Sequence, residues 1–174
     1  MTISSLSATA ALARIPELSE LLIDAIENGA AVGFMPPLTP AAAEDYWQEV
    51  IAAVEAEQRV LLVAETEGRL CGTLQLDLVN KPNGLHRAEV MKMLVHSRHR
   101  RQGIARQLLE ALEEAAQHHQ RTTLVLDTRR GDVSELLYQS MGYVRAGEIP
   151  QFARSGSGEM HATVLYYKLL GEVQ

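Results

Sequence analysis

An apolar stretch, an arginine-rich turn, an amphipathic helical segment and a second apolar stretch follow one another between residues 88 and 128. The first stretch, AEVMKMLVH (88–96), and the last, TTLVLDT (122–128), have the length and composition of strands. Between them, GIARQLLEALEEAAQHH (103–119) has apolar residues at helical spacing, with glutamates on the opposite side. Two strands joined by a crossover helix lie parallel in one sheet. This unit therefore predicts an α/β protein with parallel strands.

The remaining elements are set off by glycine, proline and asparagine. They are expected as helices at 16–29 and 39–58, a strand hairpin at 59–80, a short helix at 131–142, and strands at 143–152 and 161–170. Strands cluster both before and after the crossover unit, so the sheet should contain antiparallel pairs as well. The expected fold is mixed α+β, a central mixed sheet flanked by helices.

Bulk properties exclude several function classes. The 174 residues fit a single domain covering 1–174. The balance of 16 Lys+Arg against 22 Asp+Glu argues against a nucleic-acid partner. No apolar run reaches transmembrane length and no signal-peptide pattern is present, so we expect a cytoplasmic protein without a membrane partner. The one cysteine, Cys71, is expected to be a buried thiol. The chain is expected to be a monomer or a homodimer.

Neither of the two local histidine pairs predicts a metal site. His118 and His119 are adjacent on a helix and cannot face one ligand point. His96 and His99 have no third ligand nearby in the sequence. The expectation is therefore no metal.

Positive charge is densest in HSRHRRQGIARQLL (96–109), which has four arginines and no acid. The first turn of a helix has unpaired N–H groups and the positive end of the helix dipole. Gly103 would let a ligand approach the backbone closely. These features suit a phosphate or pyrophosphate, although a solvated basic turn is an equally good interpretation of the spacing alone. Neither the P-loop motif nor the dinucleotide-binding GxGxxG motif is present.

Three segments resemble motifs of the GCN5-related N-acetyltransferase (GNAT) family. RRQGIA (100–105) resembles its R/Q-x-x-G-x-G/A signature, AEVMKMLV (88–95) its central strand, and LLYQSMGY (136–143) the element joining its last helix to a strand. The resemblance runs from about Arg59 to the C-terminus. It implies an enzyme that transfers an acetyl group from acetyl-CoA to an amine. The alternative is a non-catalytic acyl-CoA-binding module with the same fold.

The resemblance also implies which residues contact acetyl-CoA. Main-chain N–H groups in the signature would hold its pyrophosphate; the residues are Arg100, Arg101, Gln102, Gly103, Ile104 and Ala105. The thioester would lie against the backbone of Met93, Leu94 and Val95, where the central strand splays from its neighbour. One N–H group there could stabilise the developing oxyanion by about 3 kcal/mol. Arg98 and Arg106 are expected to be steering or surface charges. Gly131 stands where family members often have a cofactor-binding asparagine, which puts that contact in doubt.

Two carboxylates compete for the role of general base. Glu89 precedes Met93 by four residues, so on a regular strand the two would share a face about 13 Å apart, a separation that favours relay through water. AEV around Glu89 resembles the A-E-I of family members whose glutamate is the base. A surface carboxylate paired with Arg87 or Lys92 is an equally good interpretation. Asp127 ends a buried strand, where a carboxylate is unusual, and could act as base or bind the substrate ammonium.

The resemblance assigns the acid and suggests an acceptor. The hydroxyl of Tyr138 would face the coenzyme sulfur, although Tyr138 could also be a core aromatic residue of an amphipathic helix. Phe34 and Met35 lie in a loop with which this family often shapes its acceptor pocket. A narrower resemblance, in GAAVGFMPPL, NKPNGLHRAEVMKMLV and LDTRRGDVSELLYQSMGYVRAGEIPQF, is to members that acetylate a β-lactam-containing amino-acid toxin. It implies a small, amino-acid-like acceptor and a role in toxin resistance.

Overall fold

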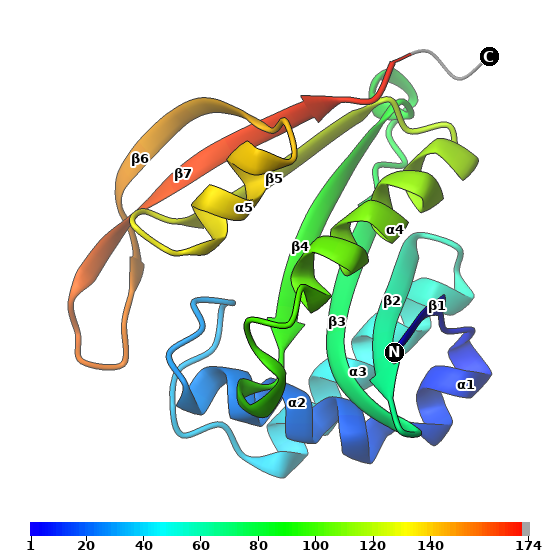
Figure 1. Ribbon diagram of the computed structural model, residues 1–174, viewed down its shortest axis with the longest axis vertical. Coiled ribbons are helices and arrows are strands. Elements are labelled where there is room, and N and C mark those ends of the chain that lie inside the picture. Colours follow the sequence, from blue (N-terminus) through cyan, green and yellow to red (C-terminus); the bar gives the residue numbers. More distant parts are fainter. Residues whose placement is uncertain (172–174) are drawn as a thin grey trace.

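A seven-stranded sheet in the order β1-β2-β3-β4-β5-β7-β6 forms the centre of the protein (Figure 1). The computed structural model describes residues 1–171. Its strands are β1 (Thr2–Ser5), β2 (Arg59–Thr66), β3 (Arg69–Leu78), β4 (Arg87–Val95), β5 (Thr123–Arg129), β6 (Val144–Arg154) and β7 (Met160–Leu169). Its helices are α1 (Ala8–Ala13), α2 (Ile15–Glu27), α3 (Pro40–Glu55), α4 (Ile104–His118) and α5 (Ser134–Ser140), with short 3-10 turns at Pro82–Gly84 and Ser97–His99.

The parallel pair predicted from the crossover unit is present. Strand β4 pairs with β5 in parallel, and the other neighbouring strands pair antiparallel. The prediction of a mixed sheet flanked by helices is therefore confirmed.

The pairing of β4 with β5 is short. Only Arg87 to Glu89 pair with Thr123 to Val125. Beyond these residues the two strands diverge, and Figure 1 shows them spreading from a common upper end. Within residues 1–171, the edge of β4 that faces β5 consequently has no strand partner after Glu89.

Helices cover both faces of the sheet. Helix α4 packs its apolar stripe on one face, where Leu108, Leu109 and Leu112 are fully buried. Gly72 of β3 allows this close approach, since a Cβ there would meet Ile104 at 3.1 Å. Helices α2 and α3 cover the other face, with Trp47 at its centre. Cys71 is buried in the core, as predicted.

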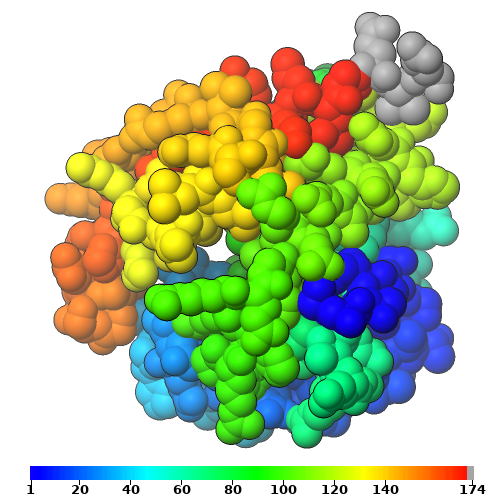
Figure 2. All heavy atoms as spheres, in the orientation of Figure 1, coloured from blue at the N-terminus to red at the C-terminus, as the bar shows by residue number. Residues whose placement is uncertain are grey.

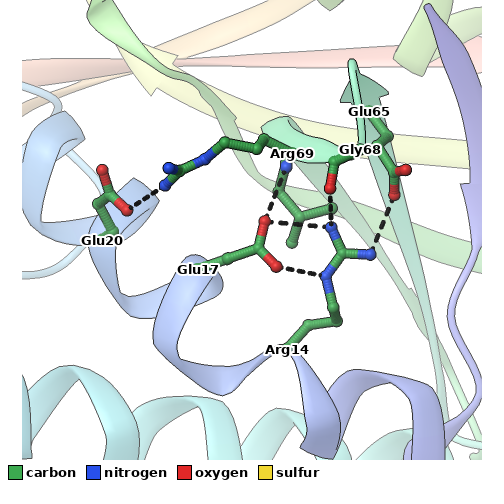
Figure 3. A network of polar contacts seen from close by, with 7 residues as sticks. Arg14, Glu17, Glu20, Glu65, Gly68 and Arg69 are labelled. Atoms are coloured by element: carbon green, nitrogen blue, oxygen red, sulfur yellow. Dashed lines mark hydrogen bonds and ion pairs between the residues drawn. The ribbon is translucent and has the colours of Figure 1, made fainter.

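The N-terminal region has two elements that the sequence analysis missed, β1 and α1. The junction of α1 and α2 is held to the β2–β3 hairpin by ion pairs (Figure 3). The Arg14 guanidinium lies 2.6 Å from the Glu17 carboxylate and 3.0 Å from that of Glu65, and it donates a hydrogen bond to the carbonyl of Gly68. Within residues 1–171, no helix has the length and apolar character needed to cross a membrane.

Candidate active site

A cavity of about 950 Å³ opens where β4 and β5 diverge. It is lined by the second half of β4, the β4–α4 turn, the end of β5, the start of α5 and the loop after α2. Figure 2 shows a hollow between the yellow β5–α5 segment and the green β4–α4 segment. Most of the predicted site residues line this cavity, namely Glu89, Met93, Leu94, Val95, Arg100, Arg101, Gly103, Ile104, Ala105, Asp127 and Tyr138.

The start of α4 is open to the cavity. Ser7 and Thr39 cap α1 and α3 with their side-chain oxygens, whereas the residue at the cap position of α4 is Gly103, which has no side chain to supply a cap. Gly103 has a left-handed φ of 78°, and a Cβ there would meet only the Gln107 side chain, at 3.9 Å. The first N–H groups of α4 are thus available to an anion.

Arginines surround this helix end. Arg100 and Arg101 line the cavity, and Arg100 donates a hydrogen bond to the Val95 carbonyl across 3.4 Å. Arg106 lines it too and donates to the Ser140 hydroxyl at 2.7 Å, which ties α4 to α5. Arg106 is exposed, as expected of a surface charge. Gln102 is exposed and does not line the cavity.

In the segments predicted to bind acetyl-CoA, two side chains are buried in the core and only their main-chain atoms face the cavity. Leu94 and Ile104 are each 2% exposed, so their side chains belong to the core. Only main-chain atoms of these two residues can serve a ligand. The unpaired edge of β4 offers such atoms to the cavity at Met93 to Val95.

A bulge interrupts β4. The register with β3 shifts between Gln75–Met91 and Thr73–Leu94, and Lys92 has a left-handed φ of 56°. The extra residue reverses the alternation of side chains. Met93 packs on the α4 side of the sheet, while Glu89 lies opposite Asp77 on the side of α3. The expectation that Glu89 and Met93 share a face was therefore wrong.

Two carboxylates face the cavity from the diverging strands. Asp127 accepts a hydrogen bond from the Thr163 hydroxyl at 2.6 Å. Glu89 has no hydrogen bond or ion pair with any group in residues 1–171, so neither Arg87 nor Lys92 pairs with it in the described part of the chain. Partial burial raises the pKa of Glu89, and the negative charges of Asp127 and Asp77 raise it further.

Tyr138 lies in the core and also borders the cavity. It is buried, and its ring packs near those of Tyr143 and Tyr166. It also lines the cavity, and within the described chain its hydroxyl has no hydrogen-bond partner. Burial raises the pKa of Tyr138 well above its usual range, so the hydroxyl stays protonated and can donate.

The loop after α2 contributes different residues from those predicted. Residues 28–33 line the cavity, whereas Phe34 and Met35 do not. Phe34 packs edge-to-face on Tyr46 at 5.1 Å, and Met35 is 49% exposed. Their contact with an acceptor stays a prediction.

The sequence analysis missed Lys92 and Thr163. Lys92 lines the cavity and donates a hydrogen bond to the carbonyl of Val32. A lysine inside the apolar run VMKMLV was the available signal. Thr163 reaches Asp127 from β7, a partnership that no local pattern reveals.

Comparisons with known proteins agree with this architecture. The sequence model of the acetyltransferase (GNAT) family matches residues 23–143. Rat N-acetyltransferase 8 is 36% identical over 90 residues, which are 49% of this chain and 40% of that protein. The chain thus spans less than half the length of this relative. An uncharacterized N-acetyltransferase from the hisH-hisA intergenic region of Azospirillum brasilense is 30% identical over 115 residues, 65% of this chain and 67% of that protein.

Solved structures share the fold over nearly the whole chain. The ribosomal-protein-alanine N-acetyltransferase of Brucella melitensis superposes with a TM-score of 0.81 at 24% identity, covering 97% of this chain and 99% of that one. The yncA protein of Salmonella typhimurium, solved with acetyl-CoA, gives 0.81 at 19% identity, covering 99% and 95%. Together with the family match over residues 23–143, this shows that the chain belongs to the acetyltransferase (GNAT) family, whose enzymes use acetyl-CoA as co-substrate.

Proposed function

We propose that this protein transfers the acetyl group of acetyl-CoA to the amine of a small, amino-acid-like molecule. The observation that carries the proposal is that an uncapped helix start and a pair of carboxylates open into one cavity. The helix start suits the pyrophosphate of the donor, and the carboxylates suit the ammonium of an acceptor. A β-lactam-containing amino acid, the acceptor of the tabtoxin resistance protein to which the narrower resemblance points, is the first candidate.

In this proposal the β4–α4 turn binds the donor. The N–H groups from Arg100 to Ala105 hold the pyrophosphate, and the guanidinium groups of Arg100 and Arg101 add charge-assisted hydrogen bonds. The unpaired edge of β4 at Met93 to Val95 binds the arm that carries the thioester. An N–H group there stabilises the oxyanion that forms when the amine attacks, which is worth about 3 kcal/mol.

Glu89 acts as the base. Its raised pKa makes it a better proton acceptor than an ordinary glutamate, and no group of the described chain occupies its oxygens. It takes a proton from the ammonium, and the freed nitrogen lone pair attacks the thioester carbon. Asp127, held by Thr163, orients the ammonium for this transfer.

Tyr138 assists the departure of the thiolate. A thiol has a pKa of about 8.5, below the raised pKa of this phenol, so complete proton transfer from Tyr138 would be unfavourable. We therefore assign Tyr138 a hydrogen bond to the leaving sulfur as the C–S bond breaks. The nitrogen gives up its second proton to solvent as the tetrahedral intermediate collapses to the amide, and the thiolate takes a proton from solvent as CoA is released.

Two assays test the proposal. Acetyl-CoA should raise the midpoint of thermal unfolding, and thiol release in the presence of candidate amines, including tabtoxinine-β-lactam, should show turnover. Binding without turnover for any amine would favour the non-catalytic acyl-CoA-binding module. Turnover with other amino acids but not with tabtoxinine-β-lactam would refute only the assignment of the toxin as acceptor.

A further inference from the structure

A lysine of the cavity wall, Lys92, has no carboxylate partner in the described part of the chain. Lys92 is half-buried and lines the cavity wall. Besides its hydrogen bond to Val32, its Nζ lies 5.7 Å from the centroid of the Phe34 ring and 6.0 Å from that of Tyr46. Across residues 1–171, no carboxylate comes within the 4.0 Å that defines an ion pair with this nitrogen. A partly desolvated cation of this kind gains stability when an anion binds beside it.

The bulge in β4 aims Lys92 at this position. In a regular strand Lys92 would point to the same side as Val90, whose side chain lies in the core under α4. The left-handed φ of 56° at Lys92 instead sends its side chain to Phe34 and Tyr46, on the side of α3. Residues other than glycine rarely adopt this backbone conformation, and bulges near active sites often redirect a side chain.

The neighbouring loop leaves room for the ammonium. A Cβ at position 33 would lie 3.2 Å from the Nζ of Lys92, and Gly33 has none. The hydrogen bond to Val32 uses one of the three N–H donors of Lys92. The ammonium keeps two further N–H donors that no hydrogen bond within residues 1–171 uses.

We infer that Lys92 binds the carboxylate of the acceptor, which is therefore a free amino acid, and this inference rests on the proposed function. The cavity wall then carries a cation at Lys92 and two carboxylates at Glu89 and Asp127. A zwitterion matches this arrangement, with its ammonium at the carboxylates and its own carboxylate at Lys92. An amine without a carboxylate, or a peptide whose N-terminal residue has its carboxyl group in an amide bond, brings no carboxylate to the position beside its amine, so Lys92 keeps only the more distant charges of Asp127 and Glu89.

A purely structural role makes a different prediction. If Lys92 only ties the loop after α2 to β4 through Val32, its loss should lower kcat/KM equally for every acceptor. If Lys92 binds the carboxylate, its loss should lower kcat/KM only for acceptors that carry a carboxylate. Matched pairs of acceptors therefore separate the two roles.

The experiment compares Lys92→Met with the native protein on each standard L-amino acid, on its carboxamide and on short peptides. Thiol release gives kcat/KM for each acceptor. Lys81→Met is the matched control, because Lys81 is exposed and lies outside the cavity. The native protein should prefer the best free acid over its carboxamide by at least about tenfold. Lys92→Met should lower kcat/KM for that acid by about 10- to 100-fold and for the carboxamide by less than about threefold. The KM for acetyl-CoA should not change.

The outcomes separate this inference from the proposed function. A carboxamide or peptide acetylated as well as the free acid overturns carboxylate recognition while acetyl transfer stands. Equal losses for acid and carboxamide in Lys92→Met also overturn it, in favour of the structural role. A native protein that binds acetyl-CoA and acetylates no amine refutes the proposed function itself.

Discussion

Replacing Gly103 by alanine separates donor binding from folding. Gly103 and Gly68 have the same left-handed φ of 78°, and both have space for a Cβ, with nothing within 4 Å at Gly68 and only Gln107 at 3.9 Å from Gly103. Each substitution therefore costs mainly the left-handed conformation, about 1–2 kcal/mol. In a chain of this size that lowers the midpoint of thermal unfolding by roughly 2–8 °C. Gly68→Ala is consequently a matched control for stability.

The two variants should differ in donor affinity. At Gly103 the new methyl group stands at the open start of α4, where the N–H groups face the cavity. Losing one charge-assisted hydrogen bond to the pyrophosphate costs about 1.5–3 kcal/mol, which corresponds to a Kd for CoA raised about 10- to 150-fold. Gly68 lies in the β2–β3 turn outside the cavity, so Gly68→Ala should leave the Kd unchanged.

Calorimetric titration of CoA into both variants and the native protein measures this difference, and thermal unfolding checks that both variants fold. Equal Kd values for Gly103→Ala and the native protein would refute the pyrophosphate site at α4. If both variants lose the same affinity for CoA, the loss in Gly103→Ala comes from its lower stability and not from the pyrophosphate site.

Three further substitutions probe the catalytic groups and the fold. Glu89→Gln should lower kcat/KM about 10²- to 10⁴-fold. Because the pKa of Glu89 is raised above 4.5, the rate of the native protein should fall as the pH drops through that raised pKa. A variant with the same pH–rate profile as the native protein would contradict the role of Glu89 as base. Tyr138→Phe should lower kcat about tenfold, the loss of one hydrogen bond to a charged sulfur, with little change in CoA affinity by titration; unaltered turnover would remove Tyr138 from the mechanism. Arg14→Ala should lower the free energy of unfolding by about 1–3 kcal/mol in urea titrations, since Glu17 and Glu65 lose their shared partner. Arg14 lowers the pKa of Glu17 below 4.5. The part of the stability difference that Glu17 contributes should therefore be complete above pH 4.5 and disappear as the pH falls through the lowered pKa. A stability difference that persists in acid would argue against the ion pair.

The crossover unit could be predicted because each of its parts has a local signature. The helical spacing between residues 103 and 119 marks α4, and the apolar runs on either side mark β4 and β5. Gly103 after the arginines likewise marked the open helix start. In these places local pattern and tertiary structure agree.

The rest depends on contacts between distant segments. Strand β1 is only four residues of mainly polar sequence, and it forms by pairing with β2. The bulge at Lys92 contains no glycine that would mark it, so the faces of Glu89 and Met93 were misassigned. The contact of Thr163 with Asp127 forms only when β7 lies beside β5. The extent of the single domain, the oligomeric state and the cytoplasmic location stay predictions.

The most direct test of acetyl transfer follows the acetyl group itself. The native protein is incubated with acetyl-CoA labelled in the acetyl group and with a panel of amino acids that includes tabtoxinine-β-lactam, and the products are identified by mass spectrometry. We predict that the label appears on the amine nitrogen of an amino acid, with CoA thiol released in equal amount. Binding of acetyl-CoA with no label on any amine would contradict the account.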